Sequence, residues 1–146
     1  MKYKWIFVLA FFCFLTTSAF SQVEFYLGSF NELKREAQKK NKPFFIVFTA
    51  DWCQPCKKME REVFLDNEVG KFANTHYYAL KVDGEKGYGV KIAKENFITV
   101  YPTIIIYDKD GVESKRISGY REKSNFLDDL RNHKPGAVKT KFSEFR

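Results

Sequence analysis

The sequence has few histidines and cysteines, and it has no apolar run of ordinary membrane-spanning length. Zinc binding by two of its three cysteines would need two further ligands, but His76 and His133, the only histidines, are far apart and lack ligand-like spacing. The apolar run from Trp5 to Leu15 is shorter than the roughly 20 residues that cross a bilayer. We therefore expect no metal and no other cofactor.

The first 21 residues have the three-part pattern of an export signal. A short basic start at Met1–Lys4 precedes the apolar run, and Ala19 and Ser21 satisfy the small-x-small rule for cleavage. We expect residues 1–21 to be removed after Ser21. The simplest destination is the periplasm of a bacterial envelope.

Residues 1–21, the leader, have two alternative interpretations: a retained anchor helix and a lipoprotein signal. A retained anchor helix would have a longer apolar run with basic residues directly after it, and neither is present. Lipidation of Cys13 would need a small residue just before it, where Phe12 stands. Removal of the leader leaves Cys53 and Cys56 in a compartment where disulfides persist.

Composition indicates one folded domain. Hydrophobic residues make up 45% of the 146 residues and aromatic residues 18%, which suffices for a core and excludes a disordered chain. The net charge of +7 comes from basic residues scattered among acidic ones, without a basic stripe. We therefore expect no nucleic-acid partner, and we expect a monomer.

Helix and strand patterns alternate over residues 22–133, and a strong turn signal at Asp108–Gly111 predicts a hairpin. This order predicts an α/β fold with a mixed sheet and helices on both faces. Residues 134–146 are expected to form a mobile tail. The predicted helices begin at Ser29 or Asn31, near Cys53, at Asp66, at Val90 and at Ser124; the predicted strands are Phe44–Phe48, His76–Val82, Val100–Tyr107 and Glu113–Ser118.

Cys53 and Cys56 are separated by two residues at the predicted start of a helix, where Pro55 fits the first turn. The unpaired N–H groups there favour a thiolate at Cys53. Cys56, one turn further in, is expected to be the more buried. Cys53 would then attack a substrate disulfide, and Cys56 would resolve the mixed disulfide. A purely structural disulfide is the alternative, but it does not explain Trp52 and Pro55.

The segment Ala50–Lys57 resembles the active site of the thioredoxin superfamily. Tyr101-Pro102-Thr103 resembles its cis-proline segment, and the resemblance extends over roughly Phe25 to Asn132. Within the superfamily the chain is most similar to the C-terminal periplasmic domain of DsbD-type thiol:disulfide interchange proteins. The similarity lies in Ala-Asp-Trp-Cys-x-x-Cys-Lys-x-x-Glu and the Asp66–Val69 segment that follows.

This resemblance implies a thioredoxin fold and a role for each matched residue. Cys53 would be the nucleophile and Cys56 the resolving thiol. Pro102 would be cis and would expose backbone for pairing with a substrate segment. Trp52 would shield the disulfide and, with Tyr101, Pro102 and Thr103, contact substrate. The alternatives are a core role for Trp52 and a simple strand position for Tyr101.

The chain departs from the family at one position. Thioredoxins carry a buried aspartate six residues before the first cysteine, as a proton relay for the resolving thiol, and Val47 stands there. Glu60 lies one helical turn beyond Cys56, where DsbD-type domains carry an acid, and it is the candidate replacement. The alternative for Glu60 is a solvated surface position. Asp51 is expected to be a surface acid and not a base.

The residues between the cysteines influence the direction of electron flow. Strongly oxidising relatives place a histidine there, whereas this chain has Gln54-Pro55. We therefore expect a reducing pair that acts on protein disulfides, with a membrane electron donor of the interchange type as a possible partner. The competing hypothesis is a redox-inactive binding or chaperone module. An isomerase would be expected to add a dimerisation module, for which the length leaves no room.

Overall fold

A central four-stranded sheet organises the molecule. The computed structural model describes residues 21–132; the predicted signal peptide and tail lie outside the described residues, apart from Ser21. The strand order is β2-β1-β3-β4, with β1 parallel to β2 and antiparallel to β3, and β3 antiparallel to β4. The predicted mixed sheet is confirmed. The strands are β1 (Phe44–Thr49), β2 (Tyr78–Asp83), β3 (Thr103–Tyr107) and β4 (Glu113–Ser118).

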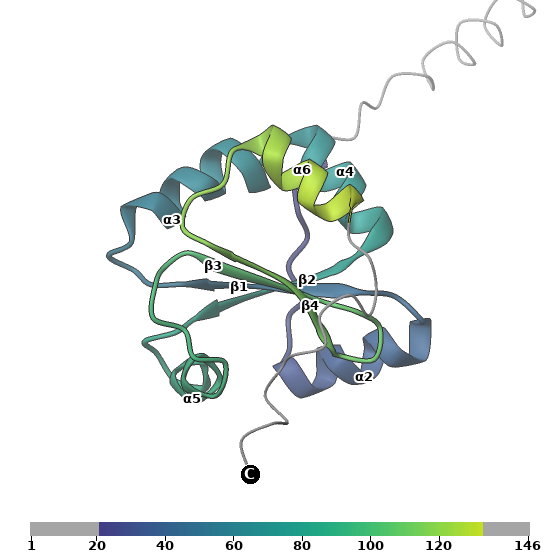
Figure 1. Ribbon diagram of the computed structural model, residues 1–146, viewed down its shortest axis with the longest axis horizontal. Coiled ribbons are helices and arrows are strands. Elements are labelled where there is room, and N and C mark those ends of the chain that lie inside the picture. Colours follow the sequence, from purple (N-terminus) through teal and green to yellow (C-terminus); the bar gives the residue numbers. More distant parts are fainter. Residues whose placement is uncertain (1–20, 133–146) are drawn as a thin grey trace, which may run out of the picture.

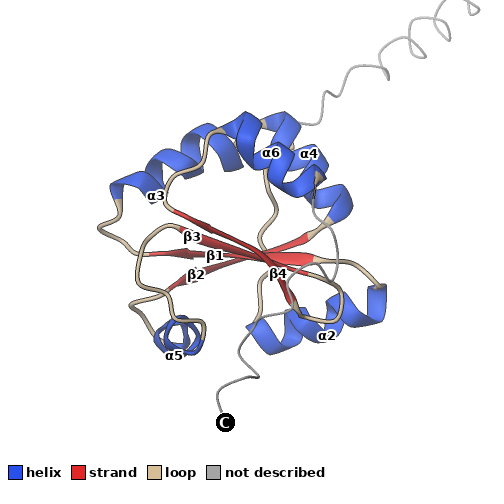
Figure 2. Ribbon diagram, in the orientation of Figure 1, coloured by secondary structure: helices blue, strands red, loops and turns tan. Residues whose placement is uncertain are grey.

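Helices cover both faces of this sheet (Figures 1 and 2). One face carries α3, α4 and α6, and the other carries α2 and α5. Because both faces are covered, every residue of Phe44–Phe48 in the central strand β1 is buried, as its continuous apolar run predicts. The helices are α2 (Phe30–Lys40), α3 (Gln54–Met59), the π-helical segment η1 (Glu60–Phe64), α4 (Asn67–His76), α5 (Tyr88–Glu95) and α6 (Lys123–Arg131).

Two apolar clusters, one on each face, form the core. Phe45, Val47 and Phe126 belong to the cluster under α3, α4 and α6, whereas Phe44 and Phe48 belong to the cluster over α2 and α5. Alternate residues of β1 thus point to opposite faces, as strand geometry requires. The strand is fixed from both sides, and its C-terminal end therefore holds the following turn in place.

Four element starts differ from the predicted ones, and one of them is that of α5, which begins at Tyr88 and not at Val90. Strand β2 begins at Tyr78, because α4 continues to His76. Strand β3 begins at Thr103 and not at Val100, so the residues before the proline form a loop. The expected N-cap at Ser124 is wrong: Glu122 is the N-cap of α6, and its carbonyl accepts the N–H of Phe126. Ser29, by contrast, caps α2 as expected, in a capping box with Glu32.

Candidate active site

Cys53 and Cys56 form a disulfide at the C-terminal end of β1. The S–S distance is 2.10 Å and the two Cα atoms are 5.3 Å apart. Cys53 is the N-cap of α3, and its Sγ accepts a hydrogen bond from the backbone N–H of Cys56 at 3.1 Å. Pro55 occupies the first turn, as predicted. The sulfur of Cys53 therefore faces the N–H groups that stabilise a thiolate after reduction.

The helix that carries the cysteines is anchored in the core through a π-helical segment. Met59, Val63 and Phe64 are all buried, as their spacing predicts. The change from α3 to η1 at Glu60 was not predicted, because the spacing of apolar residues alone does not separate α-helix from π-helix. Such segments occur often at functional sites, where they reorient side chains.

The burial of the two cysteines reverses the sequence-based expectation. Cys53 is 0% exposed and Cys56 is 7% exposed. Tyr101 packs against the cluster formed by Ala50 and the two cysteines, and Cys56 also lines a cavity whose lining does not include Tyr101. The expectation that Cys56 would be the more buried is therefore wrong for the disulfide form.

Two aromatic side chains stand next to the disulfide. Trp52 is 63% exposed, so the alternative of a core role is wrong. Its ring contacts that of Tyr101 edge to face, with centroids 6.1 Å apart, and its Nε1–H donates to Glu85 Oε2 at 2.8 Å. Gly84 lies against Tyr101, and a Cβ there would be 2.3 Å from the Tyr101 hydroxyl and would displace the ring. The loop after β2 thus supports both rings.

The cis-proline segment lies beside the end of β1. The Tyr101–Pro102 peptide bond is cis, as the resemblance implies. Thr103 pairs with Phe48 in the sheet, and its hydroxyl donates to the carbonyl of Val100 at 2.7 Å. The Thr103 side chain is 2% exposed. Its observed side-chain contact is the one to Val100, which stabilises the loop.

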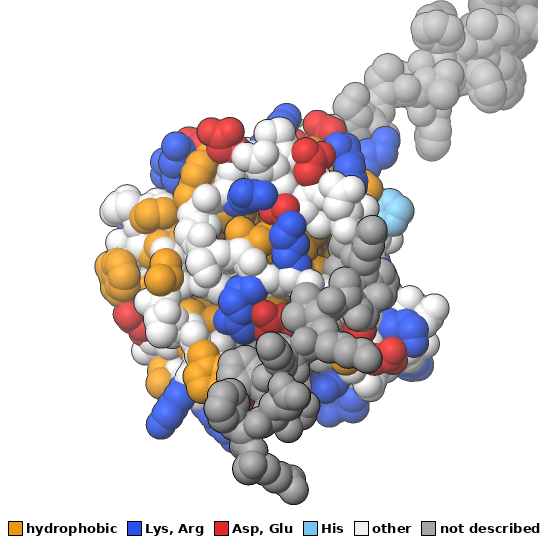
Figure 3. Space-filling model, viewed as in Figure 1, with side chains coloured by type: hydrophobic (Ala, Val, Ile, Leu, Met, Phe, Trp, Pro, Cys, Tyr) orange, Lys and Arg blue, Asp and Glu red, His pale blue; other side chains and the backbone are white. Residues whose placement is uncertain are grey.

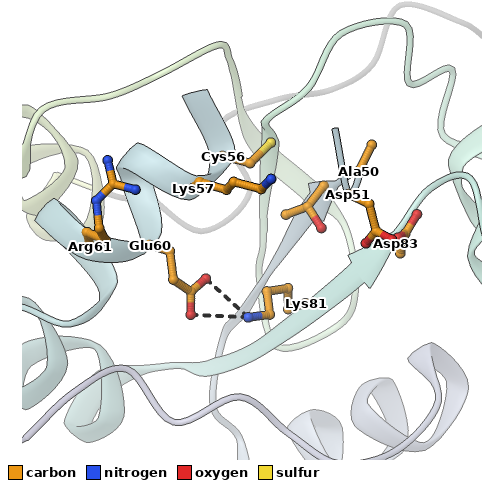
Figure 4. A pocket seen from close by; sticks show the side chains of 9 residues that line it. Ala50, Asp51, Cys56, Lys57, Glu60, Arg61, Lys81 and Asp83 are labelled. Carbon is orange, nitrogen blue, oxygen red and sulfur yellow. Dashed lines mark hydrogen bonds and ion pairs between the residues drawn. The ribbon is translucent and has the colours of Figure 1, made fainter. Parts of the chain in front are cut away.

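A cavity of about 650 Å³ reaches Cys56 (Figure 4). Glu60 and Lys81 point toward each other in it, and the Lys81 ammonium lies 3.1 Å from the Glu60 carboxylate. Lys81 is the register partner of Val47, the residue at the usual aspartate position. An ion pair therefore lies near the place where the family's buried acid is missing. The lining residues are Thr49, Ala50, Asp51, Cys56, Lys57, Glu60, Arg61, Lys81 and Asp83.

Lys81, Glu85 and Lys86 were not singled out from the sequence. Lys81 carried a signal, because it is the one Lys, Arg, Asp or Glu within the predicted strand His76–Val82. Glu85 and Lys86 carried none, since their partners lie more than 30 residues away.

Asp51 is exposed and ion-paired with Lys86. The hydrogen bond from Lys86, together with its positive charge, holds the pKa of Asp51 below its usual value. The Asp51 carboxylate therefore stays ionised at the surface near neutral pH, which agrees with the expected surface role.

Within residues 21–132 the structure shows neither a metal-binding cluster nor a membrane-spanning helix. No group of three or more His, Cys, Asp or Glu side chains in this range is placed to hold a metal ion. His76 stacks against Phe72, with ring centroids 4.5 Å apart, and His133 lies outside the described residues. No helix in the same range is long and apolar enough to cross a bilayer.

The mixed sheet with helices on both faces and the disulfide at the start of α3 make a thioredoxin fold with a Cys-x-x-Cys pair. The model of the thioredoxin-like domain family matches residues 30–134, and the chain belongs to this family.

Proteins similar to this chain include DsbD-type thiol:disulfide interchange proteins, the type indicated by the resemblance in sequence. The chain is 31% identical over 104 residues to the thiol:disulfide interchange protein DsbD of Campylobacter jejuni, covering 70% of this chain but only 18% of that protein. The C-terminal domain of Neisseria meningitidis DsbD in the reduced form matches with a TM-score of 0.60 and 22% identity, covering 71% of this chain and 93% of that one. The expected likeness to DsbD-type domains is confirmed.

A further solved structure is closer in sequence. A proposed disulphide-isomerase from Bacteroides thetaiotaomicron is 31% identical with a TM-score of 0.67, and the match covers 76% of this chain and 92% of that one. The curated DsbD relatives are much longer than the matched segment, so their complete activity does not transfer to this chain.

Proposed function

We propose that the protein is an exported protein-disulfide reductase that acts through Cys53 and Cys56. One observation carries the proposal: Cys53 Sγ lies at the N-terminus of α3 and accepts the N–H of Cys56. This arrangement favours the thiolate once the pair is reduced. Gln54 and Pro55 are neutral and add no positive charge beside the Cys53 thiolate. Such a charge would stabilise the reduced form further and make the cysteine pair strongly oxidising. Export rests on the leader in residues 1–21.

The catalytic cycle moves two electrons. The Cys53 thiolate attacks one sulfur of a substrate disulfide, which forms a mixed disulfide and releases one substrate thiolate. The Cys56 thiolate then attacks Cys53 Sγ, which closes the enzyme disulfide and releases the second substrate thiolate. Each released thiolate takes a proton. A dithiol donor, in our proposal a membrane protein of the interchange type, returns the two electrons by the same exchange in reverse.

Glu60 is the proposed proton acceptor for Cys56. Both residues line the same cavity, and Lys81 holds the Glu60 carboxylate in place within it. Val47 cannot accept a proton, so the relay has to use another residue. Lys81 also supplies a positive charge that favours a thiolate at Cys56.

Substrate binding is assigned to the surface around the disulfide. Trp52 and the ring of Tyr101 border Cys53, and the cis bond at Pro102 lies on the same side. An extended substrate segment that reaches Cys53 has to pass over these residues. Thr103 contributes by stabilising the loop through Val100.

Insulin reduction tests the proposal. The reduced protein should precipitate insulin B chain, Cys53→Ser should abolish turnover, and Cys56→Ser should accumulate the mixed disulfide. A protein whose disulfide exchanges with dithiothreitol but which never reduces insulin would be the redox-inactive binding module. Isomerase activity is the second candidate, because of the 31% identity to the Bacteroides protein. Recovery of scrambled ribonuclease, measured alongside, separates the two activities.

A further inference from the structure

The loop between β2 and α5 lies against the turn that leads into the cysteines. It spans residues 84–87, and the backbone N–H of Gly84 donates to the carbonyl of Thr49, the last residue of β1, at 2.9 Å. Figure 1 shows this loop and the turn between β1 and α3 at the same end of the sheet, and in the same view Figure 3 shows hydrophobic side chains gathered at that end. Thr49 also lines the cavity that reaches Cys56. The loop is thus anchored next to the candidate active site.

Two adjacent charged residues of this loop hold the two residues that precede Cys53. Glu85 Oε2 accepts a hydrogen bond from the indole N–H of Trp52 at 2.8 Å. The Lys86 ammonium pairs with the Asp51 carboxylate. The loop therefore contacts two consecutive side chains of the turn, and both contacts come from polar groups of defined direction.

The backbone of the loop places Glu85 before any substrate arrives. The Glu85 N–H donates to Asp83 Oδ1 at 2.9 Å. A glycine stands directly before Glu85 and another two residues after it. Gly84 lets the chain pass close to the Tyr101 ring, and Gly87 has a φ of +52°, which favours glycine. The backbone at Glu85 is therefore held between two points that fix the path of the loop.

Trp52 needs such an anchor, because most of its side chain is in water. The residue is 63% exposed, and its ring contacts Tyr101 edge to face. An exposed side chain keeps its rotamer freedom unless a directed contact removes it. A hydrogen bond from the indole N–H to a carboxylate is charge-assisted, and it is therefore stronger than one between neutral groups. Glu85 and Tyr101 together thus fix the indole beside the disulfide.

We propose that Glu85 is a positioning residue that acts through Trp52, and that it makes the enzyme favour protein disulfides over small thiol reagents. The inference rests on the proposed function and extends it to substrate selection. A fixed indole restricts the approach of small reagents to Cys53, which is buried beside Tyr101. The same fixed ring gives a protein substrate a preorganised contact, which needs little further ordering when the substrate binds.

A double-mutant cycle between Glu85 and Trp52 tests this inference. In Glu85→Ala, the oxidised protein should react about threefold faster with dithiothreitol, and the reduced protein about threefold more slowly with insulin, as expected for the loss of one hydrogen bond. In a Trp52→Ala background the same substitution should change neither rate. Glu85→Gln should behave as the wild type, because its amide oxygen still accepts the indole N–H. Glu95→Ala is the matched control, since Glu95 is an exposed acid that pairs with Lys91 on α5.

Fluorescence anisotropy reports on the indole directly. Trp5 and Trp52 are the two tryptophans of the sequence, so in a Trp5→Phe chain the signal comes from Trp52. Glu85→Ala should lower the anisotropy, because the freed indole moves on the nanosecond timescale, and Glu85→Gln should keep it.

Three results would overturn the inference and leave the proposed function intact. They are wild-type rates or wild-type anisotropy in Glu85→Ala, an effect of Glu85→Ala that persists in the Trp52→Ala background, and a Glu85→Gln variant that behaves like Glu85→Ala. The last result would assign the effect to the charge of Glu85 and not to its hydrogen bond. A wild-type protein that exchanges with dithiothreitol but does not reduce insulin would overturn both the proposed function and the inference.

Discussion

The Lys81 ammonium lies 3.1 Å from the Glu60 carboxylate inside the cavity that reaches Cys56. Lys81 extends from the strand β2 and Glu60 from the start of η1, so the pair joins the sheet to the helix that carries the cysteines. The register of β1 and β2 places Lys81 beside Val47, the position of the family's usual acid. The ion pair and Cys56 thus line the same cavity.

Glu60→Gln should slow resolution of the mixed disulfide by about 100-fold, at the lower end of general base effects. The glutamine keeps the size of the side chain but cannot accept a proton. Stopped-flow measurement of the second exchange step checks this. Glu95→Gln is the control, because Glu95 pairs with Lys91 on α5 outside the cavity. An unchanged rate in Glu60→Gln would return Glu60 to a plain surface role.

Lys81→Met should move the pH profile of the same step to higher pH. The Cys56 thiolate loses a nearby cation, so more of the thiol stays protonated at a given pH. The rate of mixed-disulfide decay is measured at pH values from about 5 to about 9. A profile that coincides with that of the wild type would show that Lys81 acts on Glu60 alone or not at all.

Trp52→Ala should make the disulfide react several-fold faster with dithiothreitol and more slowly with insulin. The exposed indole stands beside the disulfide next to Tyr101 and is held by Glu85, so its removal opens Cys53 to small reagents. The same change removes a contact surface for a protein substrate. Val112→Ala is the control, because Val112 is an exposed residue in the hairpin between β3 and β4. If the reaction rates with dithiothreitol and with insulin change in the same direction, Trp52 does not discriminate between small reagents and protein substrates.

The sequence predicts the sheet and the chemical centre, because both depend on local patterns. The continuous run Phe44–Phe48 indicates a strand buried on both faces, and Cys53 and Cys56 flank a proline at a helix start. Element ends were less accurate: the first hydrogen bond of α6 reaches back to Glu122, two residues before the expected cap.

The surroundings of the disulfide could not be predicted in the same way. The Glu60–Lys81 pair joins residues 21 apart and depends on how η1 lies over the sheet. The burial order of the cysteines depends on Tyr101, which is 48 residues beyond Cys53 in the sequence. Contacts of this kind follow from tertiary packing, which no single stretch of sequence encodes.

Asp129→Asn should destabilise the fold by about 1.5–3 kcal/mol at pH 7, the range for hydrogen bonds to a charged group. Burial alone would raise the pKa of Asp129, but hydrogen bonds from Arg121 and Lys115 outweigh it and hold the pKa below its usual value. Such a group stabilises the fold above its unfolded pKa of about 3.9 and loses this contribution as the pH falls through its folded pKa.

Urea unfolding at pH 7 and at lower pH measures this effect. The difference between wild type and Asp129→Asn should be full at pH 7 and should shrink below about pH 4. Asp128→Asn is the control, because the Asp128 side chain is 64% exposed. A difference that is independent of pH would mean that the carboxylate charge does not contribute.

The redox potential of the Cys53–Cys56 pair tests the central claim most directly. It is obtained by equilibrating the protein in dithiothreitol buffers and counting free thiols by mass after alkylation. The account predicts a value near that of thioredoxin, about −270 mV, because Gln54-Pro55 adds no cation beside the Cys53 thiolate. A value near that of DsbA, about −120 mV, would contradict it and make the protein an oxidant.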